Sequence, residues 1–154
     1  MRKSTEKTSR LLKAAVLALS AVFCLFMPVM TGAGLIYNRS SYGESLAFTG
    51  ILFIVSALLM TTGAVLCGSR KKVRNAISVL LSLLGAILCM AMLRKLCLHA
   101  DVSGWSDKFT MERISHMYER RILPCIIPVI MSVIMSLVRI ISRKDDKGEY
   151  TSIL

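Results

Sequence analysis

Methionine, cysteine and histidine are the residues of this sequence whose side chains could do chemistry. The chain holds ten methionines, five cysteines and two histidines. Thioether, thiol and imidazole groups together suit a soft ion such as copper(I). The candidate ligands for such an ion are Met27, Met30, Met90, Met92, Cys97 and His99. Because methionine also fills irregular gaps between packed helices, we predict no bound metal or other cofactor and keep soft-metal handling as an alternative.

The two histidines, His99 and His116, do not form an evident catalytic centre. Glu112 stands four residues before His116, so a helix would place both on one face. A pair of this kind is usually a surface ion pair, whereas an enzyme needs a nucleophile, an acid–base pair or a metal. We therefore predict that the protein is not an enzyme and name no catalytic residue.

Four apolar runs absorb most of the 154 residues, 55% of which are hydrophobic. They cover about 11–33, 46–68, 75–97 and 122–142. About 20 helical residues cross the roughly 30 Å hydrocarbon layer at about 1.5 Å per residue. The sequence therefore predicts an all-α integral membrane protein, a four-transmembrane-helix bundle that forms a single membrane domain over residues 1–154.

Positive charge is concentrated in alternate polar segments of the chain. Of the 20 lysines and arginines, 13 lie in the N-terminal tail through Lys13, in the basic turn 70–74, or from Arg139 onward. Segments rich in Lys and Arg stay on the cytoplasmic side, so we expect a plasma-membrane protein with both termini in the cytoplasm. The net charge of +11 then favours anionic lipid headgroups as a partner. Nucleic acid is disfavoured as a partner, because the sequence does not interleave aromatic and basic residues.

The middle of each predicted span lacks ionisable side chains. No Asp, Glu, His, Lys or Arg stands there. Ion-coupled transporters generally use such groups as relays, although helices broken by proline can replace them. Pro28 and the pair Pro124 and Pro128 are the candidates for such breaks. The pattern disfavours a secondary transporter that acts alone.

Small residues recur every four positions along the third span, at Ser78, Ser82 and Ala86. In lipid, a ridge of small residues lets helix backbones approach closely. We predict that these three residues form a helix-packing face.

The polar segment before the fourth span has the pattern of an amphipathic helix over about 107–121. Met111, Ile114, Met117 and Tyr118 gather on one side, while charged residues occupy the others. Such a helix is expected to lie in the outer membrane interface. The alternative is a docking face for a protein partner, with the candidates Met111, Glu112, Ile114, Met117, Tyr118 and Glu119. A charged tail, 143–154, ends the chain.

Two features of the sequence leave alternatives open. The first apolar run follows basic residues and ends near Thr31, Gly32 and Ala33, as a cleaved signal peptide could, although its length and Pro28 favour a retained span. The cysteines contain no C-x-x-C motif, and only Cys97 and Cys125 stand where an outer disulfide could form.

No motif in the sequence identifies a family. The missing chemistry and the patterned segment 107–121 predict a small multi-pass membrane protein. We expect a non-enzymatic accessory or assembly subunit of a membrane complex, bound to another membrane protein or to a second copy of itself. The alternative is a small transport or soft-metal-handling membrane protein.

Overall fold

The computed structural model describes residues 2–69, 71–105 and 112–148, and it is helical through most of these ranges. Four of the described helices are long and apolar enough to cross a membrane: Thr8–Tyr37, Glu44–Leu66, Lys72–Val102 and Ile114–Ile141. Large apolar side chains such as Leu80, Ile87 and Ile134 stay exposed on the outside of the bundle. An exposed apolar exterior is suited to lipid rather than to water. The helical class and the four long apolar helices agree with the sequence-based prediction.

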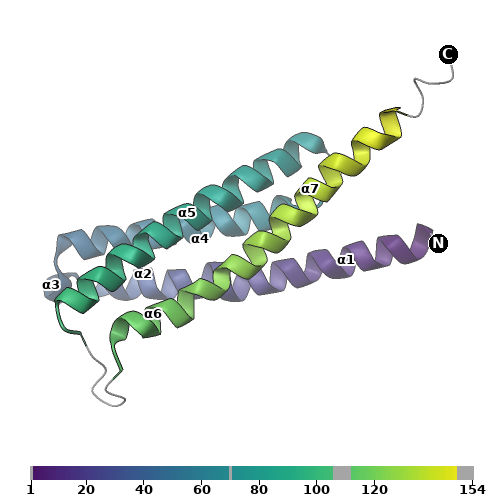
Figure 1. Ribbon diagram of the computed structural model, residues 1–154. Coiled ribbons are helices and arrows are strands. Elements are labelled where there is room, and N and C mark those ends of the chain that lie inside the picture. The colour runs from purple at the N-terminus through teal and green to yellow at the C-terminus, as the bar shows by residue number, and fades with distance from the viewer. Residues whose placement is uncertain (1, 70, 106–111, 149–154) are drawn as a thin grey trace.

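The first long helix contains a change in hydrogen-bond register. It consists of α1 (Arg2–Leu19), a π-helical segment η1 (Ser20–Phe26) and α2 (Met27–Tyr37). The amide of Met27 donates to the carbonyl oxygen of Val22, five residues back. Pro28 has no amide and cannot complete the α-helical pattern at the next position. The helix therefore continues past Pro28 with one wide turn instead of breaking (Figure 1).

Two tight connections flank the second long helix. The short helix α3 (Arg39–Tyr42) leads through Gly43, with φ of 85°, into α4 (Glu44–Leu66). At the other end Gly68 takes φ of 66°, and α5 (Lys72–Val102) follows. The Asn75 side chain accepts from the Ser69 amide at 2.9 Å and donates to its carbonyl at 2.9 Å. Helix α5 thus begins at Lys72, three residues before the predicted start at residue 75. Asn75 lies inside the first turn of the helix and stabilises the α4–α5 connection through its two hydrogen bonds to Ser69.

The fourth long helix is also built from joined pieces. Helix α6 (Ile114–Ile122) passes through one 3₁₀ turn, η2 (Leu123–Cys125), into α7 (Ile126–Gly148). Pro124 lies in that turn, where a missing amide is tolerated. Figure 1 shows α6 leading directly into α7. Helix α6 is therefore continuous with the last span.

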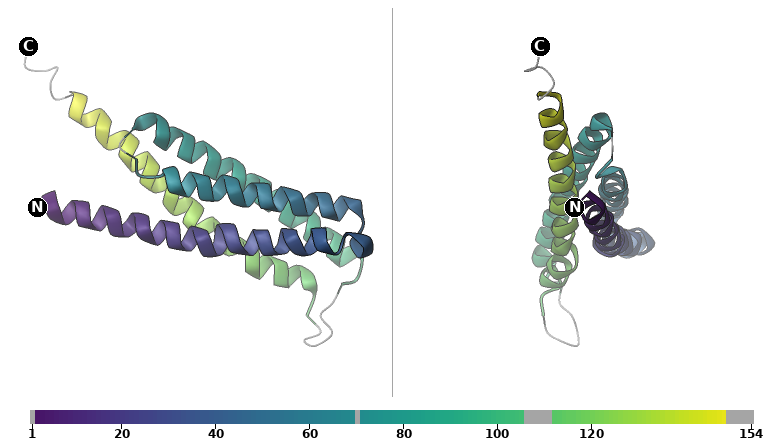
Figure 2. Two further views of the ribbon diagram at one scale, coloured as in Figure 1. Left: turned by 180° about the vertical axis from the view of Figure 1, so that it is seen from behind. Right: turned by 90° about the vertical axis from the view of Figure 1, so that its right-hand side faces the viewer.

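Helices α4 and α5 form the centre of the bundle. Helix α4 packs against α5 and α2, while α5 also contacts α6 and α7. The start of α1, the α4–α5 turn and the end of α7 lie at one end of the bundle, and α3 and α6 lie at the other (Figure 2). A Cβ on Gly32 would lie 2.5 Å from the Gly50 carbonyl oxygen. Glycine is thus required where α2 crosses α4.

Candidate functional site

The interior of the bundle contains a set of serine hydroxyls that join three helices. Ser78 donates to the Gly63 carbonyl oxygen at 2.7 Å, and its oxygen lies 3.1 Å from the Ser136 hydroxyl. Since Ser78 has only one hydroxyl proton, Ser136 must be the donor of the second bond. The chain of bonds therefore runs from α7 through α5 to α4.

A second serine pair lies one turn further along the same helices. The hydroxyls of Ser82 and Ser132 are 3.1 Å apart, and Ser132 donates to the Val129 carbonyl at 2.9 Å. Ser82 is therefore the donor to Ser132. All four serines are buried, and no buried side-chain nitrogen or oxygen in the described ranges lacks a hydrogen-bond partner. These hydroxyls are engaged in helix-to-helix contacts.

The structure places two of the three proposed packing residues in this contact. Ser78 and Ser82 are buried, while Ala86 is only half-buried. Gly85 takes the next buried position, and a Cβ on it would lie 2.7 Å from Cγ of Met60. Steps of four residues drift around a helix with 3.6 residues per turn, so the contact face moves from Ala86 to Gly85.

Helix α6 begins later than the sequence pattern indicated. Glu112 and Arg113 are not helical, and Arg113 is extended with φ of −63° and ψ of 131°. Helix α6 therefore starts at Ile114. Met111 and the rest of 106–111 lie outside the described residues. Ser115, which the apolar pattern did not include, is buried and donates to Asp101 at 2.8 Å.

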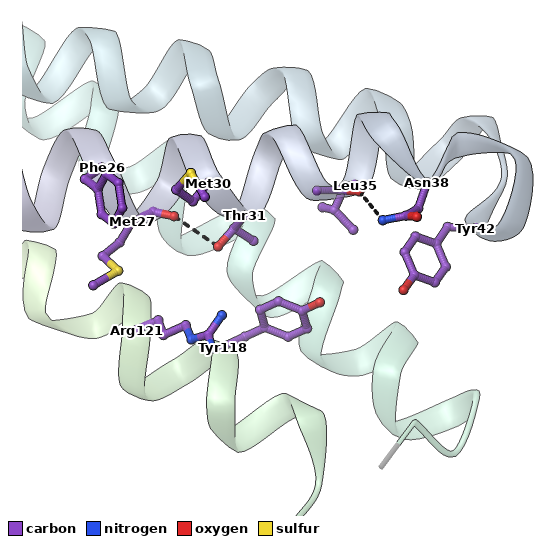
Figure 3. A pocket seen from close by; sticks show the side chains of 10 residues that line it. Phe26, Met27, Met30, Thr31, Leu35, Asn38, Tyr42, Tyr118 and Arg121 are labelled. Carbon is purple, nitrogen blue, oxygen red and sulfur yellow. Dashed lines mark hydrogen bonds between the residues drawn. The ribbon is translucent and has the colours of Figure 1, made fainter. Parts of the chain in front are cut away.

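The proposed docking residues fall on different sides of α6. Ile114 and Met117 are half-buried. Tyr118 faces α2, as Figure 3 shows. Glu112 pairs with Arg120 at 2.9 Å, and Glu119 pairs with His116 at 3.6 Å. The suggested contact between Glu112 and His116 is thus replaced by two separate contacts, an ion pair between Glu112 and Arg120 and a contact between His116 and Glu119.

A groove between α2, α3 and α6 was not indicated by any sequence motif. It has a volume of about 450 Å³. Its lining residues are Phe26, Met27, Met30, Thr31, Gly34, Leu35, Asn38, Tyr42, Tyr118 and Arg121. In Figure 3 the side chains of Arg121 and Tyr118 extend from α6 toward α2. The groove joins residues more than 80 positions apart in the chain.

The six soft-metal candidates have different surroundings. Met27 and Met30 line the groove, whereas Met90 and Met92 pack against the apolar core. His99 is exposed, with its ring centroid 5.3 Å from that of Trp105. The buried Cys97 thiol donates to the Ser115 carbonyl at 3.6 Å. The described His, Cys, Asp and Glu residues form no group of three placed to hold a metal ion.

The cysteines are all free and buried. Cys125 does not pair with Cys97; instead its carbonyl oxygen accepts from the Cys24 thiol at 3.4 Å. The Cys125 thiol forms a side-chain hydrogen bond with the Cys89 thiol. The Cys97–Cys125 disulfide that the sequence left open is therefore not formed, because the Cys97 thiol contacts α6 and the Cys125 thiol contacts Cys89 on α5.

Comparison of the chain with known protein families, with curated proteins and with solved structures gave no match.

Proposed function

We propose that the protein is a non-enzymatic accessory or assembly subunit of a membrane complex. In this proposal the four long helices span the plasma membrane, and both termini are cytoplasmic. The end of the bundle that carries α3 and α6 then faces outward. The basic turn 71–74, the start of α1 and the end of α7 lie together at one end of the bundle (Figures 1 and 2). Their shared position supports this orientation, because basic segments stay on the cytoplasmic side.

The interior supports a structural role. The buried serine hydroxyls form hydrogen bonds with one another and with helix backbone carbonyls; they belong to Ser78, Ser82, Ser132 and Ser136. Polar side chains used in this way hold helices together in lipid. These hydrogen bonds stabilise one arrangement of α4, α5 and α7. A partner protein would therefore bind to the surface of the bundle.

The single observation that carries the proposal is the charged surface formed by α6 and by Glu112, which lies just before it. Glu112 and Arg120 place both signs of charge side by side at the α3–α6 end of the bundle, and Glu119 adds a second acid beside His116. Exposed pairs of this kind add little to stability. A mixed-sign surface can, however, select a partner with the complementary pattern and set the rate of encounter. We therefore place the partner contact on α6 and on Glu112, which lies just before it, with Glu112 and Glu119 as the acidic residues of the contact.

The test uses the full-length protein purified in mild detergent together with its co-eluting partner. Glu112 and Glu119 are both changed to Lys, and the amount of partner recovered is measured at equal expression. The matched control is Glu44→Lys, which reverses an exposed acid paired with Arg39 at the same end but outside α6. We expect the double reversal to abolish recovery and the control to preserve it.

Full recovery with the double reversal would contradict the docking role of α6. Loss of recovery in both the double reversal and the Glu44→Lys control would point to a general charge effect and would also contradict it. If the only co-purified protein is the chain itself, the complex is a homo-oligomer and the same comparison applies to its assembly. The transport and soft-metal alternative stays a prediction.

A further inference from the structure

The groove between α2 and α6 combines an apolar end with a cationic and hydroxyl-bearing wall. Phe26 and Met27 lie at one end (Figure 3). Arg121, Tyr118 and Tyr42 follow one another from there toward the other end. The lining includes one cation and no Asp or Glu. This arrangement suits a molecule with an anionic head and an apolar tail.

Arg121 lacks an acidic partner within the part of the chain that the structure describes. The nearby acids are engaged elsewhere, in the pairs Glu112–Arg120, Glu119–His116 and Glu44–Arg39. A cation in a membrane-spanning segment is costly unless a counter-charge or water meets it. An anion from outside the chain would supply that counter-charge.

The groove runs along the part of the first long helix that ends beside α3. It follows the first long helix from Phe26 to Asn38, which is about 18 Å at about 1.5 Å per residue. The apolar end therefore lies toward the middle of the first span, and the hydroxyl-bearing end lies beside α3.

We infer that this groove binds an anionic phospholipid from the leaflet beside α3 and α6. The lipid phosphate binds the guanidinium of Arg121, whose planar fork matches phosphate oxygens. The headgroup lies along the hydroxyls of Tyr118 and Tyr42. An acyl chain passes Phe26 and Met27 into the bilayer. This lipid site adds a ligand to the proposed subunit and does not depend on the partner contact of α6.

The first test compares adjacent arginines. Full-length protein in mild detergent is titrated with phosphatidylglycerol or with phosphatidylcholine of the same acyl chains, and bound lipid is counted by native mass spectrometry. We expect phosphatidylglycerol to bind more tightly. Arg121→Gln should weaken its binding by about tenfold or more, because a charge-assisted hydrogen bond is lost. Arg120→Gln, which removes an equal charge outside the groove, should leave binding unchanged.

The second test fills the groove from its wall. Gly34 lines the groove, and a Cβ on it meets no atom within 4 Å, so the side chain of Gly34→Leu begins in open space on the groove wall. We expect this variant to lose phosphatidylglycerol binding while it retains the unfolding temperature of the wild type. Retained binding in Gly34→Leu would overturn the proposed location, and equal losses in the two arginine variants would overturn the proposed role of Arg121.

Glycerol phosphate serves as a third arm, because it carries the headgroup charge without acyl chains. We expect it not to displace phosphatidylglycerol at equal concentration. Displacement would show a site for soluble phosphates and would contradict the lipid assignment. Arg121→Lys, which keeps the charge, should retain part of the binding and provides the comparison if the Gln variant does not fold.

Discussion

The hydroxyl of Ser78 on α5 donates a 2.7 Å hydrogen bond to the carbonyl oxygen of Gly63 on α4. Ser82 lies one turn further along α5, and a Cβ placed on Gly63 would lie 2.2 Å from its Oγ atom. The two helix backbones therefore meet where a glycine faces two serines. Close backbone approach between small residues is a principal source of helix association in lipid.

Gly63→Ala should destabilise the bundle. The added methyl group must displace Ser82 or separate α4 from α5, and overpacking of this kind costs roughly 1–3 kcal/mol. The measurement is the free energy of unfolding in mixed detergent micelles. Gly34→Ala is the matched control, because its Cβ meets open space. Equal effects of the two substitutions would show that α4 and α5 do not approach closely at Gly63.

Ser82→Leu should destabilise the protein by a similar amount, roughly 1–3 kcal/mol, since Ser82 is fully buried between helices. Ala91→Leu on the same helix should have little effect, because Ala91 is exposed on the outside of the bundle. Thermal unfolding in detergent compares the two variants. An unchanged unfolding temperature for Ser82→Leu would mean that this face of α5 contacts lipid.

The hydrogen bond between Ser136 and Ser78 should give a measurable coupling. Each serine is changed to Ala alone and then together, and the unfolding free energies are combined in a double-mutant cycle. Interhelical hydrogen bonds in a membrane protein average about 0.6 kcal/mol, with values up to about 1.7 kcal/mol. We expect a coupling in that range. Strictly additive losses would contradict the bond.

The cysteines should be unreactive in the folded protein. All five are buried, with at most 9% of any one exposed, so a thiol-specific maleimide should label them only after denaturation. Mobility on a denaturing gel should be the same with and without reductant, since no disulfide is formed. Rapid labelling of the native protein would contradict the packing around Cys24, Cys89 and Cys125.

The helices could be predicted from the sequence because each apolar run is long and continuous. The observed helix ends differ by several residues from the predicted ends, because polar residues can extend a helix beyond its apolar run. Helix α5, for example, continues from Lys72 to Val102 with Arg94 and Lys95 exposed on its surface. The serine ridge was visible in the spacing of Ser78 and Ser82, and the burial of both follows from that pattern.

The groove could not be predicted from the sequence. It requires Arg121 to reach Met27 and Thr31, and this depends on how the first and fourth long helices cross. The sequence also showed no sign that Gly63 would be the partner of the serine ridge, because periodicity defines a face but does not identify the helix that it meets. The later start of α6 reflects the extended backbone of Arg113, which overrides the apolar spacing.

Single-cysteine accessibility in intact cells tests the membrane arrangement most directly. A cysteine is placed at Ser40 in α3 or at Lys72 at the start of α5, and the wild type gives the background from the buried native thiols. A membrane-impermeant maleimide should label position 40 from outside and label position 72 only after the membrane is opened. Labelling of position 72 in intact cells, or equal labelling of both positions, would contradict a bundle with α3 and α6 outside and the basic turn inside.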